Sequence, residues 1–229
     1  MKRNKTLSVL KYIFLAVLSA VSIFPFFWMI ISATNTAAEV NAGKLTFGAH
    51  LAENLSSLFH SDLHFGASVG NSMIIALITT VLALLISSVA GYGFEIFRSK
   101  ARDRVFNILL LSMMIPFCAL MIPLYRMFGA AGKAGLTGIG LNTLFSVIMP
   151  SICTAFLIFF FRQNAKSFPK DILEAARIDG LNEPRIFIHM YVPVMKSSYA
   201  AAAIVTFMSS WNNYLWPLVA LQDPQKRTG

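Results

Sequence analysis

Charged residues are scarce in this chain of 229 residues, of which 13% are Asp, Glu, Lys or Arg. A water-soluble domain carries about 25%, so this chain has too little polar surface to cover a soluble globule. Cysteine is also scarce. Cys118 and Cys153 both lie inside apolar runs, which argues against a disulfide scaffold and indicates packing residues. Because 56% of the chain is hydrophobic, the class that remains is a polytopic membrane protein.

Apolar runs long enough to cross a bilayer are present instead. A helix needs about 20 predominantly apolar residues to span the hydrocarbon core. The predicted spans are residues 12–32, 73–92, 106–128, 144–161 and 199–221. Together they contain one charged residue, Arg126. We therefore predict an all-α bundle of membrane-spanning helices that forms a single transmembrane domain over residues 1–229.

The positive charges indicate the orientation of these spans. With the N-terminus in the cytoplasm, 14 of the 19 Lys and Arg residues lie on the cytoplasmic side and 5 lie outside. Cytoplasmic loops of membrane proteins carry such an excess. Topology thus explains the net charge of +9, and no nucleic acid partner is expected. In this orientation residues 33–66 form an extracytoplasmic loop and residues 162–198 form a cytoplasmic loop.

Asp, Glu, His and Lys are absent from the five predicted spans. Proton- and ion-coupled carriers usually need such a residue within the membrane, so its absence weakens the alternative of a stand-alone secondary carrier or channel. A neutral, hydroxyl-rich solute needs only hydrogen-bonding and aromatic groups, which Thr79, Thr80 and other polar residues of the spans offer. The candidates for a translocation path are Asn71, Trp211, Asn212, Asn213 and Tyr214. The alternative for the Ser and Thr residues is helix packing. The alternative for the aromatic residues Trp211, Tyr214 and Trp216 is an aromatic belt at the membrane interface.

Four prolines lie inside the predicted spans, at Pro25, Pro116, Pro123 and Pro150. Each removes one backbone hydrogen bond and can kink its helix. Broken helices fit a transport pathway, and they equally fit ordinary packing in a membrane bundle.

The cytoplasmic loop at residues 162–198 is long enough to fold. Its pattern predicts two short helices. Gly180 suits the left-handed position just past the end of the first, and Asn182 can cap the second, with Pro184 in its first turn. Glu174 and Arg177 are predicted neighbours on the first helix.

The same loop resembles the EAA loop of ABC importer permeases. The resemblance rests on Glu174-Ala175-Ala176, on Gly180, and on Met190 and Pro193 at the matching spacing. That family has Ile where Met190 stands and Leu at position 192, and both differences keep an apolar residue. The strings EAARIDG and WNNYLWPL are similar to the carbohydrate branch, the maltose-type permeases.

The resemblance implies a bacterial inner-membrane protein with several spans, in which the EAA loop docks on an ATPase. Ala175 and Ala176 would permit close approach, and Glu174 would pair with a cation. The implied partners are a second permease subunit, two ATPase subunits, a soluble substrate-binding protein and the lipid bilayer. ATP and magnesium would be bound by the ATPase, since the chain has no phosphate-binding loop of the form G-x₄-G-K-[ST]. No catalytic or metal site is expected, and a sixth span is expected to be missing at the C-terminus.

Overall fold

The computed structural model describes residues 5–61, 64–223, 226 and 228. Within these residues helices are the only regular secondary structure, which confirms the predicted all-α fold class. The chain forms two compact units, Met1–Phe65 and Gly66–Gly229.

The first unit begins with the long helix α1 (Lys5–Ala33), which contains Pro25. Its segment Leu7–Ala33 is long and apolar enough to cross a membrane, and its most apolar stretch buries nothing within the chain's own fold. The first predicted span is therefore confirmed as a single helix. Its apolar side chains are free to face lipid or protein outside this chain.

Two short helices follow α1 in the segment that was predicted as a folded loop, α2 (Ala37–Asn41) and α3 (Leu51–Phe59). The side-chain amide of Asn54 on α3 donates hydrogen bonds to the carbonyl oxygen atoms of Ala33, at 2.9 Å, and of Asn35, at 3.0 Å. These bonds hold α3 against the end of α1.

A capping box begins α2. The Thr36 side chain accepts from the backbone N–H of Glu39, and the Glu39 carboxylate accepts from the backbone N–H of Thr36. The Lys44 ammonium lies 2.7 Å from the same carboxylate. This hydrogen-bonded ion pair, with the hydrogen bonds from Thr36, lowers the pKa of Glu39 from 4.5 to about 2.

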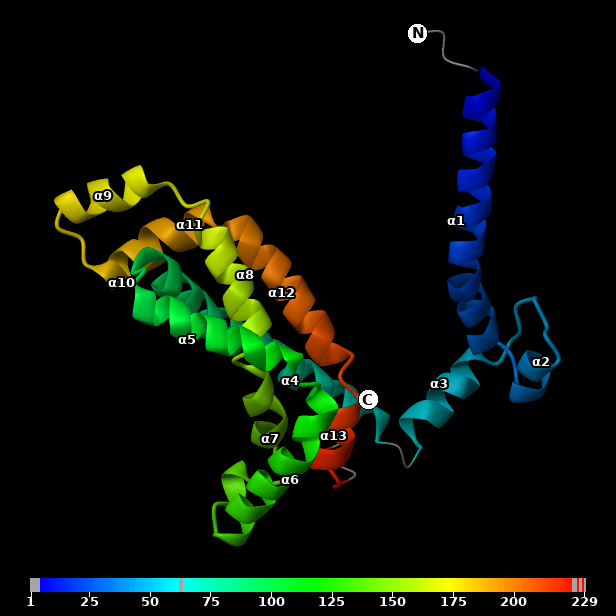
Figure 1. Ribbon diagram of the computed structural model, residues 1–229. Helices are drawn as coiled ribbons and strands as arrows, with labels where there is room; N and C mark the ends of the chain where they lie inside the picture. Colours follow the sequence, from blue (N-terminus) through cyan, green and yellow to red (C-terminus); the bar gives the residue numbers. More distant parts are fainter. Residues whose placement is uncertain (1–4, 62–63, 224–225, 227, 229) are drawn as a thin grey trace. The chain divides into compact units, whose positions relative to one another are not determined.

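The second unit holds the remaining helices. In Figure 1, α9, α10 and α11 lie at one end of this unit, and α6, α7 and α13 lie at the other. The elements are α4 (Phe65–Ile96), α5 (Lys100–Leu111), η1 (Ser112–Met114), α6 (Phe117–Lys133), η2 (Thr137–Ile139), α7 (Leu144–Ile148), η3 (Met149–Ser151), α8 (Ala155–Ala165), α9 (Lys170–Ile178), α10 (Glu183–Ile186), η4 (Phe187–Tyr191), α11 (Val192–Val194), α12 (Lys196–Trp211) and α13 (Leu215–Ala220).

The second predicted span is the single helix α4, whereas the third and fourth are bent. The helical segment of α5 and η1 meets α6 at 98°, and the segment of α7 and η3 meets α8 at 42°. Pro116 is the residue that caps α6, and Pro150 lies in η3. Breaks thus occur at Pro116 and a few residues after Pro150, each of which removes a backbone donor, whereas Pro25 and Pro123 lie inside the continuous helices α1 and α6.

The structure differs from the prediction at the fifth span. A continuous helix was expected over residues 199–221, but α12 ends at Trp211 and α13 begins at Leu215. Pro217 lies in the first turn of α13, where its ring is tolerated. In an uninterrupted helix that ring would clash with the carbonyl group of Asn213, four residues earlier. By length and composition, the described residues hold two single helices able to cross a membrane, or up to four spans if each bent pair crosses once.

Small residues form most of the buried face of α4, which lets neighbouring helices approach closely, as in other membrane proteins. They are Ser68, Ser72, Ala76, Thr79, Thr80, Ala83, Ser87, Ser88 and Gly91. The closest approach is at Gly91, where an added Cβ atom would lie 2.6 Å from Cβ of Phe161 and 2.7 Å from the backbone nitrogen of Arg162. The backbone of α8 therefore packs directly on α4.

Trp216 is fully buried at the end of the unit that contains α6, α7 and α13. Its indole Nε1 donates a hydrogen bond of 2.9 Å to the carbonyl oxygen of Ser146. The alternative of an interfacial aromatic belt is therefore wrong for this residue, which is a core residue with a satisfied donor.

Candidate functional site

Helix α9, which carries the Glu-Ala-Ala sequence, has one buried and one exposed face. Leu173 and Ala176 are buried in a hydrophobic cluster of the second unit. Glu174 and Ala175 are exposed, and the Ile178 side chain is 85% exposed. Ala176, which was predicted to face a partner, thus packs inside this chain. The outward surface is formed by Glu174, Ala175 and Ile178, which we call the α9 face.

The turn after α9 confirms the role predicted for Gly180. This glycine has φ +79°, a left-handed conformation that other residues rarely adopt. The backbone N–H of Gly180 donates to the carbonyl oxygen of Arg177, and that of Leu181 donates to the carbonyl oxygen of Ala176. These two bonds define a Schellman motif. An added Cβ atom at Gly180 would meet no atom within 4 Å, so only the backbone conformation requires glycine here.

Glu183 at the start of α10 connects the loop to the helix bundle. Its Oε1 atom accepts a hydrogen bond of 2.7 Å from Nε of Arg177 on α9. Its Oε2 atom accepts one of 3.1 Å from the hydroxyl group of Tyr92 on α4. The bond to Glu183 raises the pKa of the Arg177 guanidinium above its ordinary value. Glu183 is thus the hydrogen-bonded acidic partner of Arg177, and Glu174, its predicted neighbour on α9, contributes a smaller electrostatic effect in the same direction.

The second half of the loop is helical as predicted. The Asn182 side chain accepts from the backbone N–H of Arg185 and caps α10, and the π-helical turn η4 follows directly. Met190 is half-buried and packs against the hydrophobic cluster. Pro193 is exposed in the short helix α11. Neither residue belongs to the α9 face.

A buried arginine fixes the start of the loop. Arg162 is 6% exposed and donates hydrogen bonds to Glu95 on α4, at 3.3 Å, and to Asp103 on α5, at 2.5 Å. Its guanidinium carbon lies 4.1 Å from the centre of the Phe106 ring. A buried cation with partners on three sides holds α8 to both neighbouring helices, so the loop begins at a fixed point.

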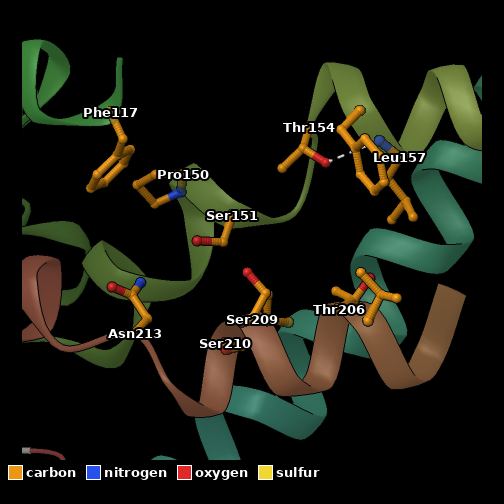
Figure 2. Close-up of a pocket in the computed structure, with 12 residues that line it drawn as sticks. Phe117, Pro150, Ser151, Thr154, Leu157, Thr206, Ser209, Ser210 and Asn213 are labelled. Carbon is orange, nitrogen blue, oxygen red and sulfur yellow. Dashed lines mark hydrogen bonds between the residues drawn. The ribbon is translucent and has the colours of Figure 1, made fainter. Parts of the chain in front are cut away.

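A cavity of about 340 Å³ lies within the second unit, among the broken helices. Figure 2 shows its lining residues, which come from the start of α6, from η3, from the start of α8, from the end of α12 and from α4. Its polar lining consists of Thr79, Ser151, Thr154, Thr206, Ser209, Ser210 and Asn213. We call this space the helix-break cavity.

Several polar groups of this cavity have no partner within the described part of the chain. The Thr79 hydroxyl is buried and makes no hydrogen bond. Figure 2 shows Ser151 of η3 and Ser209 of α12 on facing sides of the cavity, with the Ser209 hydroxyl pointing toward Ser151. The Thr154 hydroxyl, by contrast, is used as a cap and accepts from the backbone N–H of Leu157.

The structure brings one of the predicted path residues, Asn213, to the cavity. The other four lie elsewhere. Trp211 stacks on the neighbouring aromatic ring of Phe207, and the Asn212 side chain donates to a carbonyl group of its own helix. Tyr214 is 66% exposed, and Asn71 is half-buried on α4.

Sequence reasoning missed Ser151, Thr154, Thr206, Ser209 and Ser210, although Thr79 was among the polar residues considered. Four of these residues lie at or near the ends of helical segments, and Thr206 lies inside α12. A signal for two of them was present in the sequence. Ser151 directly follows Pro150, and Ser210 directly precedes the Trp-Asn-Asn string.

Residues 83–227 match a family described as "Binding-protein-dependent transport system inner membrane component". The chain is 47% identical over 226 residues to the lactose transport system permease protein LacG of Rhizobium radiobacter, covering 99% of this chain and 80% of that protein. It is 34% identical over 224 residues to the arabinooligosaccharides transport system permease protein AraQ of Bacillus subtilis (strain 168), covering 94% of this chain and 76% of that protein.

One solved structure shares the fold. It is the crystal structure of a bacterial ABC transporter involved in the import of the acidic polysaccharide alginate, which superposes with a TM-score of 0.84 at 22% sequence identity. The match covers 99% of this chain and 78% of that chain.

Proposed function

Because the chain belongs to the family of inner-membrane components of binding-protein-dependent transport systems, we propose that it is a membrane subunit of an ATP-driven sugar importer. It forms part of the solute path and is moved by a separate ATPase that docks on the α9 face. The resemblance to ABC importer permeases is confirmed by the family match. LacG and AraQ are named for lactose and arabinooligosaccharide transport, which supports a saccharide as the solute.

The observation that carries the proposal is the exposed apolar side chain of Ile178 on α9, a helix that is hydrogen-bonded to the rest of the unit through Glu183. Ile178 is 85% exposed beside Glu174 and Ala175. Docking of a partner on this face would remove the Ile178 side chain from water, and the small Ala175 beside it permits close approach. Glu183, with its hydrogen bonds to Arg177 and Tyr92, joins this face to α4. A force applied to the α9 face would therefore be transmitted to the spans rather than absorbed in a flexible loop.

The proposed assembly contains a second permease subunit, two ATPase subunits and a soluble substrate-binding protein. ATP and magnesium are bound by the ATPase, and residues 162–198 face the cytoplasm, as does the N-terminus. Closure of the ATPase subunits on ATP moves the docked α9 helices and switches the cavity between inward and outward access. The excess of Lys and Arg on the cytoplasmic side supports this orientation.

The test compares two identical substitutions in the same loop. Ile178→Asp removes the apolar group from the α9 face. Ile188→Asp is the control, because Ile188 is 58% exposed and lies outside α9. We expect Ile178→Asp, like Glu174→Lys, to reduce co-purification of the ATPase at least tenfold and to abolish ATP-driven uptake, since burying an unpaired charge at an interface is costly.

The control should bind the ATPase as the parent does. If Ile178→Asp and Glu174→Lys both bind ATPase and transport at the parental rate, the α9 face is not the docking surface. Uptake by the chain reconstituted without any ATPase would instead favour a stand-alone carrier or channel.

A further inference from the structure

We propose that α6, together with α13, forms a binding site for an anionic phospholipid. The site has two adjoining parts. The first is a hollow of about 570 Å³ that contains two cations, which we call the basic hollow. The second is a groove of about 290 Å³ that is lined only by apolar atoms, which we call the apolar groove. Tyr125 lines both parts, so one amphiphilic molecule can extend from the hollow into the groove.

The basic hollow places two cations on one face of α6. Arg126 and Lys133 are seven residues apart, which on an α-helix corresponds to about two turns and about 10 Å along the axis. Gly129 lies between them on the same face. Leu141 lies across from this glycine, since an added Cβ atom at Gly129 would be 3.6 Å from Cδ1 of Leu141. Because Gly129 has no side chain, an open space remains there, and both cations line it.

Neither cation has an acidic partner in the part of the chain that the structure describes. Lys133 lies in the last turn of α6, where the helix dipole favours a positive charge. This effect falls off within one turn and does not reach Arg126. Arg126 is also the single charged residue of the predicted spans. Two unpaired cations that line one hollow favour an anion from outside the chain, and Arg and Lys both bind phosphate groups well.

The apolar groove indicates which kind of anion fits. Its walls are Met121 and Ile122 of α6, Tyr125, and Val219 of α13. Figure 1 shows α6 and α13 at the same end of the second unit. An acyl chain can occupy this groove, whereas a hydrated inorganic anion gains nothing from it. The complementary ligand is therefore a lipid with a phosphate at one end and an acyl chain at the other.

The position of the site in the chain is consistent with contact to lipid. The α6 helix belongs to a bent pair of helices that is long and apolar enough to cross a membrane. The Ile122 side chain is 71% exposed, and the long Arg126 side chain can bring its charge to the level of the headgroups. A net negative headgroup is preferred over a zwitterionic one, because the two cations would repel the positive group of the latter.

The experiment uses the full chain, with the subunits that co-purify with it, in nanodiscs of phosphatidylcholine. A small fraction of the lipid carries a photoreactive group in its acyl chain and has either a phosphatidylglycerol or a phosphatidylcholine headgroup. Peptide mass spectrometry locates the cross-links. We expect the phosphatidylglycerol probe to label Met121, Ile122 or Val219 about tenfold more than the phosphatidylcholine probe, since each basic residue near an anionic headgroup contributes about fivefold. Unlabelled phosphatidylglycerol should compete, and inorganic phosphate should not.

The variants Arg126→Gln and Lys133→Gln should each lower this preference about three- to fivefold. Arg104→Gln is the matched control, because Arg104 is an exposed cation on α5 that lines neither part of the site, and it should label as the parent does. Equal labelling by the two probes, an equal loss in Arg104→Gln, or competition by inorganic phosphate as strong as that by phosphatidylglycerol overturns the proposal. Unchanged labelling of the two α6 variants, with weaker binding of the soluble substrate-binding protein, also overturns it and assigns the cations to a protein contact.

Discussion

Replacing Gly91 by alanine should separate α4 from α8. An added Cβ atom at this position would lie 2.6 Å from Cβ of Phe161 and 2.7 Å from the backbone nitrogen of Arg162. Carbon atoms pack at about 3.5–4.0 Å, so α8 would have to move away by about 1 Å. The obstructing atoms belong to the backbone and to a Cβ atom, and no side-chain rotation relieves the contact. Overpacking of this kind costs about 1–3 kcal/mol.

Gly93→Ala is the matched control on the same helix. An added Cβ atom there would meet no atom within 4 Å, so the higher helix propensity of alanine should stabilise the protein by up to about 1 kcal/mol. The midpoint of thermal unfolding, followed by size-exclusion chromatography of the heated protein in detergent, should fall by about 2–12 °C for Gly91→Ala. It should stay equal or rise for Gly93→Ala. If Gly91→Ala is as stable as Gly93→Ala, the two helices do not pack at the distance described.

Two further predictions concern charged groups. Arg162→Met leaves Glu95 and Asp103 without their buried cation, and it should lower the free energy of unfolding by about 3 kcal/mol. This value is near the lower limit for broken buried pairs because Asp103 is partly exposed. A midpoint of thermal unfolding within about 1 °C of the parent would contradict this prediction. Because the pKa of Glu39 is lowered from 4.5 to about 2, the ion pair with Lys44 stabilises residues 36–44 above pH about 4.5 and is lost as the pH falls toward 2. The protection factors of the amides in this segment, which are the exchange rates corrected for the intrinsic effect of pH, should fall over that range in the parent. The change should be much smaller in Lys44→Met, which is less protected already at neutral pH.

Local chemistry made part of this structure predictable. The two long helices follow from apolar runs without charge, and the end of α9 follows from Gly180, since its conformation depends on a single residue. The capping role of Asn182 is local in the same sense. Contacts between distant segments were not predictable in this way. Ala175 and Ala176 are chemically identical, and only the packing of α4 and of the rest of the loop decides that Ala176 is buried.

The cavity illustrates the same limit. Ser151 and Ser209 are far apart in the sequence, and neither stands out among the many Ser and Thr residues of a membrane protein, which usually bond within their own helix. Prolines predicted that helices would break, but the angle of each break depends on the neighbouring helices. The position of the cavity follows from those angles, and so it required the three-dimensional structure.

The π-helical turn at residues 187–191 determines which side of the following helices, α11 and α12, faces the interior of the unit. Ile186 and Tyr191 are both fully buried although they are five residues apart, a separation that would place them about 140° apart around an α-helix. The wider turn, with its i→i+5 bonding, brings them onto one side. From Tyr191 onward Met195, Ser198 and Ala202 continue the buried side at ordinary α-helical intervals. Deleting one residue from this turn would rotate α12 by about 100° relative to the loop, turning the Ser209 side of the helix away from the other broken helices while every residue kept its identity.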